Sequence, residues 1–283
     1  MLTMLAVVAL YTICSLNDKY AVSKAKLNGS QLTFLMAAGT LPFLALLLPF
    51  SDRTLTFSLP TFICVFLIAA SKFLEFSMGA KILVEMSVFE LKAWLGLTLF
   101  MSYATDIIMC SQGVSALKIL CIAVTVAGLV MIARSGRRKV NYKKIAVALI
   151  VYIAAKFAYG FIMNTAKAYI SSTLTVFFAL IVLALVLIPS AKPLTIAAES
   201  PEGIKGVWIV VLCKLPNALG LLGENAVAAQ SLTNYAFIQP MILVVVLILD
   251  LMKKNTRPTG WNLAGSLICV LGILGFQAVE VLL

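Results

Sequence analysis

The sequence predicts an all-α polytopic membrane protein with ten transmembrane helices in two inverted five-helix repeats. Of its 283 residues, 62% are apolar and only 12% are charged, whereas a soluble domain carries about 25% charged residues. Apolar runs of about 20 residues, the length of a spanning helix, recur along the whole chain. Lysines and arginines concentrate between alternate runs rather than on one soluble surface. These observations place most of the chain in the hydrocarbon of a bilayer.

Ten segments have the length and composition of a spanning helix: 2–20, 29–50, 60–80, 83–104, 113–133, 143–165, 170–190, 204–223, 227–250 and 260–282. Six prolines mark predicted helix ends, where a missing N–H costs least: Pro49, Pro60, Pro189, Pro193, Pro201 and Pro258. Three others fall inside spans and predict kinks: Pro42, Pro216 and Pro240. Residues 1–16 lack the positive n-region and cleavage site of a signal peptide, so we expect the first helix to be retained.

An internal repeat is indicated when the chain is compared with itself. A shift of 144 residues superimposes Ser87 on Ser231, Asp106 on Asp250, Gly128 on Gly272 and Gly79 on Gly223, and a shift of 148 superimposes Tyr11 on Tyr159 and Lys19 on Lys167. Five helices per repeat is an odd number, so the two repeats must be inverted in the membrane. We therefore expect a first repeat over 1–134, a basic linker over 135–145 and a second repeat over 146–283.

The basic residues predict the orientation, because lysine and arginine accumulate in cytoplasmic loops. Loops after even-numbered spans carry only Arg53, Lys118 and Lys167, and the other loop residues of this kind follow odd-numbered spans. This bias places the 134–144 loop in the cytoplasm and both termini on the other side. We expect an integral protein of a prokaryotic inner or plasma membrane.

Several function classes are disfavoured by composition. The chain has no histidine, which excludes a Ser-His-Asp triad and an imidazole metal site. Its six cysteines stand singly, without the spacing of a zinc or redox motif. Because the basic residues belong to membrane loops, nucleic acid is not an expected partner. We expect no enzyme activity, no metal and no cofactor.

The segment from Asn234 to Phe276, NYAFIQPMILVVVLILDLMKKNTRPTGWNLAGSLICVLGILGF, resembles the drug/metabolite transporter superfamily, in particular its EamA-like branch. Pro240 is similar to that family's mid-helix proline, and Asn17 to Tyr20 resemble the Asn-Lys ending of its nucleotide-sugar and sugar-phosphate carriers. The chain departs from the family where Gly96 stands at the equivalent of Pro240, and where Asp106 and Asp250 replace the usual Gly-Glu-Arg ending. The resemblance implies alternating-access transport and names no substrate.

Ionisable side chains at membrane depth are candidate functional residues, because each costs several kcal/mol unless it is paired or faces water. Lys72 and Glu75 are three residues apart on one helical face, which fits either a structural ion pair or a cavity role. Lys214 precedes Pro216 and Asn217. The repeat sets Lys72 opposite Pro216, so we expect Lys72 and Lys214 to face each other across the pseudo-twofold axis.

Lys156 is the strongest single candidate. It belongs to a stripe on one helical face, at i, i+4, i+7 and i+11, made by Tyr152, Lys156, Tyr159 and Met163. A buried ammonium needs a carboxylate, carbonyls or a bound anion, so a lysine in such a stripe favours a binding role over simple packing.

Other polar positions are ranked lower or left open. Glu90 and Trp94 share a helical face, whereas Lys92 points about 200° away, so both charges cannot line one cavity. Gln239 beside Pro240 either presents an amide and a freed carbonyl to a ligand or simply lies at a kink. We expect a solvated turn at Glu224, Asn225 and Gln230. The second-tier candidates are Asn17, Lys19, Lys167 and Lys92.

The sequence therefore predicts a secondary transporter with a cavity lined by Lys72, Lys156 and Lys214, with Glu75 as counter-charge. Four embedded lysines against Glu75 and Glu90 favour an anionic or zwitterionic metabolite, such as an amino acid, organic acid or phosphate. The alternative is a proton-coupled exporter of organic cations or drugs, with Glu75 or Glu90 exchanging the proton and Trp94, Tyr152 and Tyr159 supplying cation–π contacts. A non-transporting membrane protein is the rival from another class. The expected partners are a small-molecule substrate, a proton if transport is coupled, and the lipid bilayer, with the protein acting as a monomer or weak homodimer.

Overall fold

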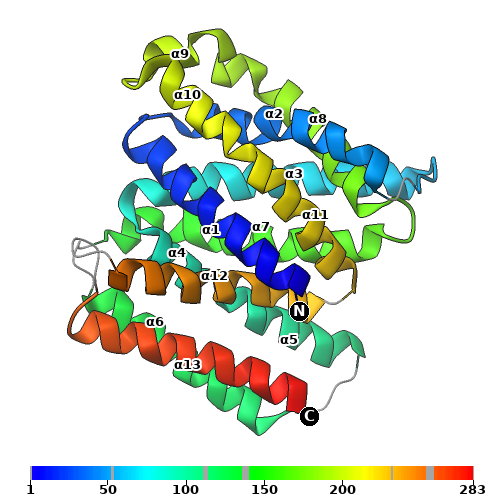
Figure 1. Ribbon diagram of the computed structural model, residues 1–283. Helices are drawn as coiled ribbons and strands as arrows, with labels where there is room; N and C mark the ends of the chain where they lie inside the picture. The colour runs from blue at the N-terminus through cyan, green and yellow to red at the C-terminus, as the bar shows by residue number, and fades with distance from the viewer. Residues whose placement is uncertain are drawn as a thin grey trace.

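The computed structural model is a bundle of α-helices (Figure 1) and describes residues 2–51, 54–110, 114–135, 140–230, 232–252 and 258–282. Within these residues the β-structure amounts to a single antiparallel bridge between Leu55 and Ile170. The basic residues at 53, 137–139 and 253–257, on which part of the orientation argument depends, lie outside the described ranges, as do residues 136–139 of the predicted linker. The side chains of Asp106, Gln230 and Pro240 are also outside the description.

The helices follow one another in this order: α1 Leu2–Ser23, α2 Gly29–Leu47, η1 Leu48–Phe50, α3 Leu59–Glu85, α4 Val88–Leu95, α5 Leu97–Cys110, α6 Ala116–Ser135, α7 Tyr142–Ala166, α8 Ser172–Ala191, η2 Pro193–Thr195, α9 Ile196–Glu199, α10 Gly203–Leu212, α11 Lys214–Gln230, α12 Leu232–Met252 and α13 Trp261–Leu282.

Six helical segments of the described chain are long and apolar enough to cross a membrane: Gly29–Phe50, Leu59–Glu85, Tyr142–Ala166, Ser172–Ala191, Gly203–Ala228 and Trp261–Val279. Large apolar side chains such as Phe66 and Leu185 are more than half exposed, as expected of residues that face lipid. The described residues are therefore almost entirely helical, and the six spans fit a polytopic membrane protein. The ten-span arrangement and the inverted repeat stay predictions.

Two of the predicted spans are interrupted. The span expected over 83–104 is wrong as a single helix, because α3 extends to Glu85 and α4 begins after Ser87. Ser87 and Glu90 form a capping box, in which each side chain accepts the backbone N–H of the other residue, and this starts a new helix. The span 204–223 divides at Cys213 into α10 and α11. Pro216 consequently lies in the first turn of α11 rather than at a mid-helix kink.

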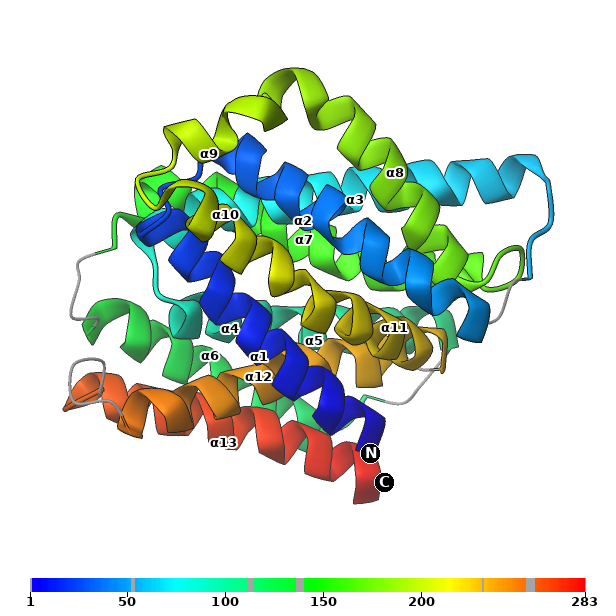
Figure 2. The ribbon, with the colours of Figure 1, turned by 45° about the horizontal axis from the view of Figure 1, so that its top comes forward.

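The central layer of the bundle consists of α1, α3, α7 and α11 (Figure 1), with α3 packed on α7 and α1 packed on α11. The α2 helix packs on α8, and α12 contacts both α1 and α4. At one edge α6 and α13 lie side by side (Figure 2). Glycines let these two backbones approach closely, because a Cβ at Gly128 would lie 2.8 Å from the Cα of Cys269.

The short α9 helix is tied to the beginning of α2. Asn28 caps α2 in a capping box with Gln31, and the Gln31 amide also donates to Glu199 at 2.5 Å. The Ser200 hydroxyl donates to the carbonyl of Ala25 at 3.0 Å. These bonds hold the segment between α8 and α10 against the turn between α1 and α2.

The carboxylate of Glu199 is expected to titrate below its ordinary range. Hydrogen bonds from the hydroxyl of Thr195 at 2.7 Å and the amide of Gln31 hold the pKa of this carboxyl below its ordinary value of 4.5. Because the folded pKa is depressed, the stabilisation is fully present above pH 4.5 and is lost as the pH falls through the folded pKa. Carbon-13 NMR of labelled glutamate, assigned with Glu199→Gln, measures this midpoint. Thr195→Val should raise it, and an unchanged midpoint in that variant would contradict the assignment of the hydrogen bond as its cause.

Candidate functional site

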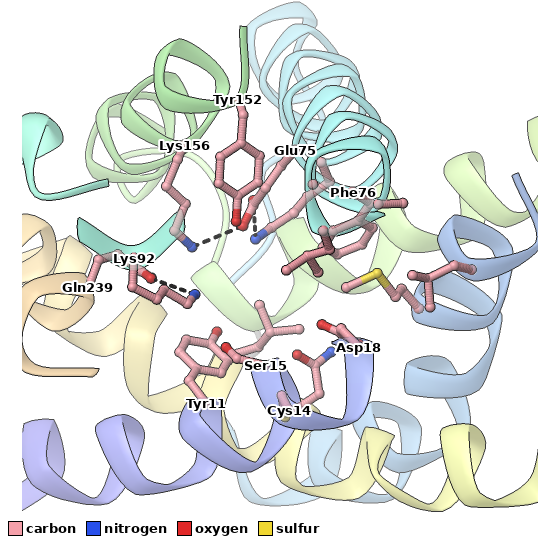
Figure 3. A pocket seen from close by; sticks show the side chains of 18 residues that line it. Tyr11, Cys14, Ser15, Asp18, Glu75, Phe76, Lys92, Tyr152, Lys156 and Gln239 are labelled. Carbon is pink, nitrogen blue, oxygen red and sulfur yellow. Dashed lines mark hydrogen bonds and ion pairs between the residues drawn. The ribbon is translucent and has the colours of Figure 1, made fainter. Parts of the chain in front are cut away.

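The centre of the bundle contains a cavity of about 70 Å³, here called the central pocket (Figure 3). That volume holds several water molecules or a small ligand group. Residues from α1, α2, α3, α4, α7, α11 and α12 line it. Its charged and polar lining residues are Tyr11, Ser15, Asp18, Lys72, Glu75, Lys92, Tyr152, Lys156, Asn217 and Gln239.

A continuous chain of ion pairs forms one wall of the pocket and extends behind it. The Lys72 ammonium lies 2.9 Å from Glu75 Oε2, and Lys156 lies 3.2 Å from Glu75 Oε1. Lys156 also lies 2.7 Å from Glu224 Oε1, and Glu224 accepts the hydroxyl of Tyr11. We call Lys72, Glu75, Lys156 and Glu224 the buried ion chain. Its two lysines and two carboxylates neutralise one another, and none of the four residues is more than 8% exposed.

Two tyrosines support this chain from outside the pocket. The Lys72 ammonium lies 3.7 Å from the ring centre of Tyr159, a close cation–π contact. The hydroxyl of Tyr159 donates to Asn225 Oδ1 at 2.5 Å, and that of Tyr235 donates to the carbonyl of Lys156 at 2.9 Å. Tyr159 is 0% exposed and does not line the pocket, so its role is to pack against the lysines.

Lys214 does not meet Lys72 across the bundle. It lies 3.0 Å from Asp18 Oδ1 and is absent from the pocket wall, whereas Asp18 lines the pocket. Asn217, one helical turn further along α11, lines the pocket and donates to Thr40 Oγ1 at 3.0 Å. Lys72 and Lys214 therefore each have their own carboxylate partner.

Lys92 differs from Lys72, Lys156 and Lys214. It is 8% exposed and lines the pocket, where its ammonium donates to Gln239 Oε1 at 2.9 Å. Among the described residues no carboxylate lies within 4.0 Å of it. A buried ammonium with only an amide as partner is electrostatically uncompensated, and it attracts an anion.

Glu90 and Trp94, which the sequence favoured over Lys92, lie away from the pocket. Glu90 caps its own helix by accepting from the backbone and side chain of Ser87. Trp94 packs edge-on against Tyr142, with ring centres 6.0 Å apart. Helical geometry correctly separated Lys92 from Glu90, but only the packing of α4 against α1 and α12 determined which face meets the pocket.

Three further hydrogen-bond donors face the pocket without a protein acceptor among the described residues. They are the hydroxyls of Tyr152 and Ser15 and the side-chain N–H groups of Gln239, and all three residues line the pocket (Figure 3). Tyr152 is only 7% exposed. Gly79 gives its ring room, because a Cβ at that position would lie 3.0 Å from Tyr152 Cε2. These donors and Lys92 line the same pocket, and such donors suit an anion.

The solvated turn expected at Glu224 and Asn225 is wrong. Glu224 is 0% exposed and Asn225 is 1% exposed. The predicted span ended at residue 223, whereas α11 continues to Gln230, so these side chains lie inside the helix and face the bundle. Asp18 and Tyr11 were also missed as site residues. Asp18 follows an apolar run within the first helix, which is the signal that would have found it.

The remaining second-tier residues do not line the pocket. Lys19 donates to the carbonyls of Leu83 and Met86, which lie at the end of α3 and lack helical partners. Asn17 is buried, and its Nδ2 has no hydrogen-bond partner within the described ranges. Lys167 is exposed at the C-terminal end of α7.

Comparison with known proteins supports the fold and leaves the function open. No family model and no curated protein matches the sequence. A solved structure described as "Crystal structure of protein" matches with a TM-score of 0.64 and 15% sequence identity, covering 98% of each chain. At that identity the match shows a shared fold over the whole chain and says nothing about the substrate.

Proposed function

We propose that this protein is a secondary transporter that moves a small anionic or zwitterionic metabolite by alternating access, using the central pocket as its binding site. The observation that carries the proposal is Lys92, a buried cation on the pocket wall whose protein partner is the neutral amide of Gln239. A purely structural lysine at this depth would be expected to have a carboxylate, as Lys72, Lys156 and Lys214 do.

The charge of the site supports an anionic ligand. Four lysines, Lys72, Lys92, Lys156 and Lys214, stand against three carboxylates, Asp18, Glu75 and Glu224. The cluster therefore carries one excess positive charge. The sequence predicted an excess of two, because that count included Glu90 and left out Asp18 and Glu224. Lysines in ion pairs contribute little net attraction, so the attraction for a ligand is centred on Lys92.

An inverted repeat, with ten spans, is part of this proposal and is supported by helix packing. Such a repeat relates α1 to α7, α2 to α8, α3 to α10 and α11, and α6 to α13. The observed contacts fit these equivalences. The α3 helix packs on α7, and their equivalents α11 and α1 pack on each other in the same way. The equivalent helices α2 and α8 are in contact, as are α6 and α13. Gly79 and Gly223, superimposed by the 144-residue shift, both lie against these partner helices, where a Cβ would meet Tyr152 or Val7.

Export of organic cations by proton exchange has less support. Glu75 lies between two ammonium groups and Glu90 caps a helix, so neither carboxylate is available to alternate between a proton and a cationic drug. The uncompensated Lys92 would also repel a cation in the pocket.

The proposal is tested by counterflow in liposomes that contain the purified protein, with a panel of small carboxylates, amino acids and phosphates. We expect at least one of these compounds to be exchanged with saturation. Lys92→Gln should lower kcat/KM for that compound about 10- to 100-fold, since a hydrogen bond to a charged group contributes ~1.5–3 kcal/mol.

The matched control is Lys144→Gln, which removes an exposed lysine paired with Glu85 and should leave exchange unchanged. Exchange of organic cations alone, with Lys92→Gln behaving as wild type, would overturn the proposal.

A further inference from the structure

We infer that the central pocket selects a small monocarboxylate of net charge −1 with a compact apolar body, an inference that rests on the proposed function and names its substrate class. The carboxylate would bind to the ammonium of Lys92, an amide N–H of Gln239 and the hydroxyl of Tyr152. We call these three residues the carboxylate cradle. Lys92 and Gln239 are bonded to each other at 2.9 Å, and all three side chains enter the pocket (Figure 3).

The number of charges in the site favours a single negative charge on the ligand. The cluster carries one excess positive charge, so a monoanion brings it to neutrality. A dianion would leave one negative charge unpaired beside Glu75 and Asp18, which line the same pocket. In a buried site an unpaired charge is costly, so dicarboxylates and phosphate dianions are disfavoured.

The hydrogen-bond donors of the cradle also favour a carboxylate over a phosphate. A carboxylate has two oxygens, and an ammonium, an amide N–H and a phenol hydroxyl are sufficient to satisfy them. Phosphate has three terminal oxygens and is most often held by the bidentate fork of arginine or by backbone N–H groups. No arginine is among the described lining residues.

An amino acid is disfavoured by the acceptors that the pocket offers. The ammonium of a zwitterion needs a carboxylate, but both oxygens of Glu75 are engaged by lysines and Oδ1 of Asp18 is engaged by Lys214. A zwitterion has no net charge, so it would not neutralise the excess positive charge at Lys92. A 2-oxo or 2-hydroxy acid avoids both costs.

The lining residues outside the carboxylate cradle determine which substrate body fits the pocket. Its apolar part is formed by Leu32, Met36, Phe76, Ala80, Leu83 and Leu221, and its uncharged polar part includes Tyr11, Ser15 and Asn217. The cavity of about 70 Å³ leaves room for a few carbon atoms in this conformation. A short branched or linear apolar chain fits against this apolar part.

Counterflow with four probes of similar size tests the inference: 2-oxoisovalerate, valine, methylsuccinate and glycerol 3-phosphate. We expect 2-oxoisovalerate to be exchanged with a kcat/KM at least about tenfold above the other three. Tyr152→Phe removes only the hydroxyl and should raise KM for 2-oxoisovalerate several-fold. Lys92→Gln should abolish the preference for the monoanion, and Lys144→Gln serves as the surface control.

The outcomes separate the two proposals. Exchange of valine, methylsuccinate or glycerol 3-phosphate in preference to 2-oxoisovalerate, with dependence on Lys92, would overturn the monocarboxylate assignment and leave the anion or zwitterion transporter standing. Equal exchange of all four probes would also overturn the selectivity. Absence of any exchange, with correctly folded protein by thermal unfolding, would overturn the transporter proposal and the inference with it.

Discussion

Replacement of Lys156 by methionine is expected to destabilise the protein by about 3–5 kcal/mol, the usual cost of removing one partner from a buried ion pair. Lys156 lies between two carboxylates, 3.2 Å from Glu75 and 2.7 Å from Glu224. Both are buried, and Glu224 would keep only the hydroxyl of Tyr11 as a partner among the described residues. The expected result is a large fall in the apparent melting temperature in detergent, with little folded protein recovered from membranes.

The double variant Lys156→Met with Glu224→Gln should recover most of this loss, because it removes the orphaned negative charge while it keeps an oxygen that accepts from Tyr11. Lys144→Met, which breaks only an exposed pair, is the matched control and should cost ~0–1 kcal/mol. A single Lys156→Met variant that melts with the wild type would contradict the buried ion chain.

The expected loss of stability affects how ligand-binding measurements on Lys156 variants are interpreted. Lys156 was the strongest candidate from sequence, yet loss of ligand binding in a Lys156 variant would reflect loss of the fold. Within the described part of the chain Lys92 has no carboxylate partner to leave behind, so Lys92→Gln removes the positive charge without creating an unpaired negative one. It is therefore the cleaner variant for a test of substrate binding.

The substitution Gly128→Ala is expected to separate α6 from α13 and to lower the free energy of unfolding by about 1–3 kcal/mol, the range for overpacking a tight contact. A Cβ at Gly128 would lie 2.8 Å from both the Cα of Cys269 and the carbonyl oxygen of Gly265. Both atoms belong to the backbone of α13, so a change of rotamer cannot relieve the clash. Thermal unfolding in detergent measures the loss.

Gly29→Ala is the matched control, since its Cβ would meet nothing closer than the Cβ of Ala80 at 4.0 Å. It should change the unfolding free energy by no more than ~0.5 kcal/mol. If Gly128→Ala were equally mild, α6 and α13 would not be held at the close distance that the structure describes.

Local interactions explain why much of the fold was predictable. Apolar length alone identified the helices, because a chain in hydrocarbon must satisfy its backbone N–H and C=O groups within each helix. The predicted helix boundaries are wrong where a local cap or a proline starts a new helix. Ser87 and Glu90 cap the start of α4 inside an apolar run, and Pro216 lies in the first turn of α11. Capping changes the helix boundary without changing hydropathy, so apolar length predicted helices in these regions but not where they start.

By itself, the sequence determined that this is a helical membrane protein with several lysines buried at membrane depth, and that Lys92 and Glu90 point to opposite sides of their helix. Only the tertiary structure decided that Lys92, unlike Lys72, Lys156 and Lys214, has no carboxylate partner among the described residues. The deciding partners are far apart in sequence: 68 residues for Lys156 and Glu224, 196 for Lys214 and Asp18, and 147 for Lys92 and Gln239. The spacing of residues within one helix determines which of them share a face. The charge that this face meets depends on the neighbouring helix, and that neighbour is chosen by packing.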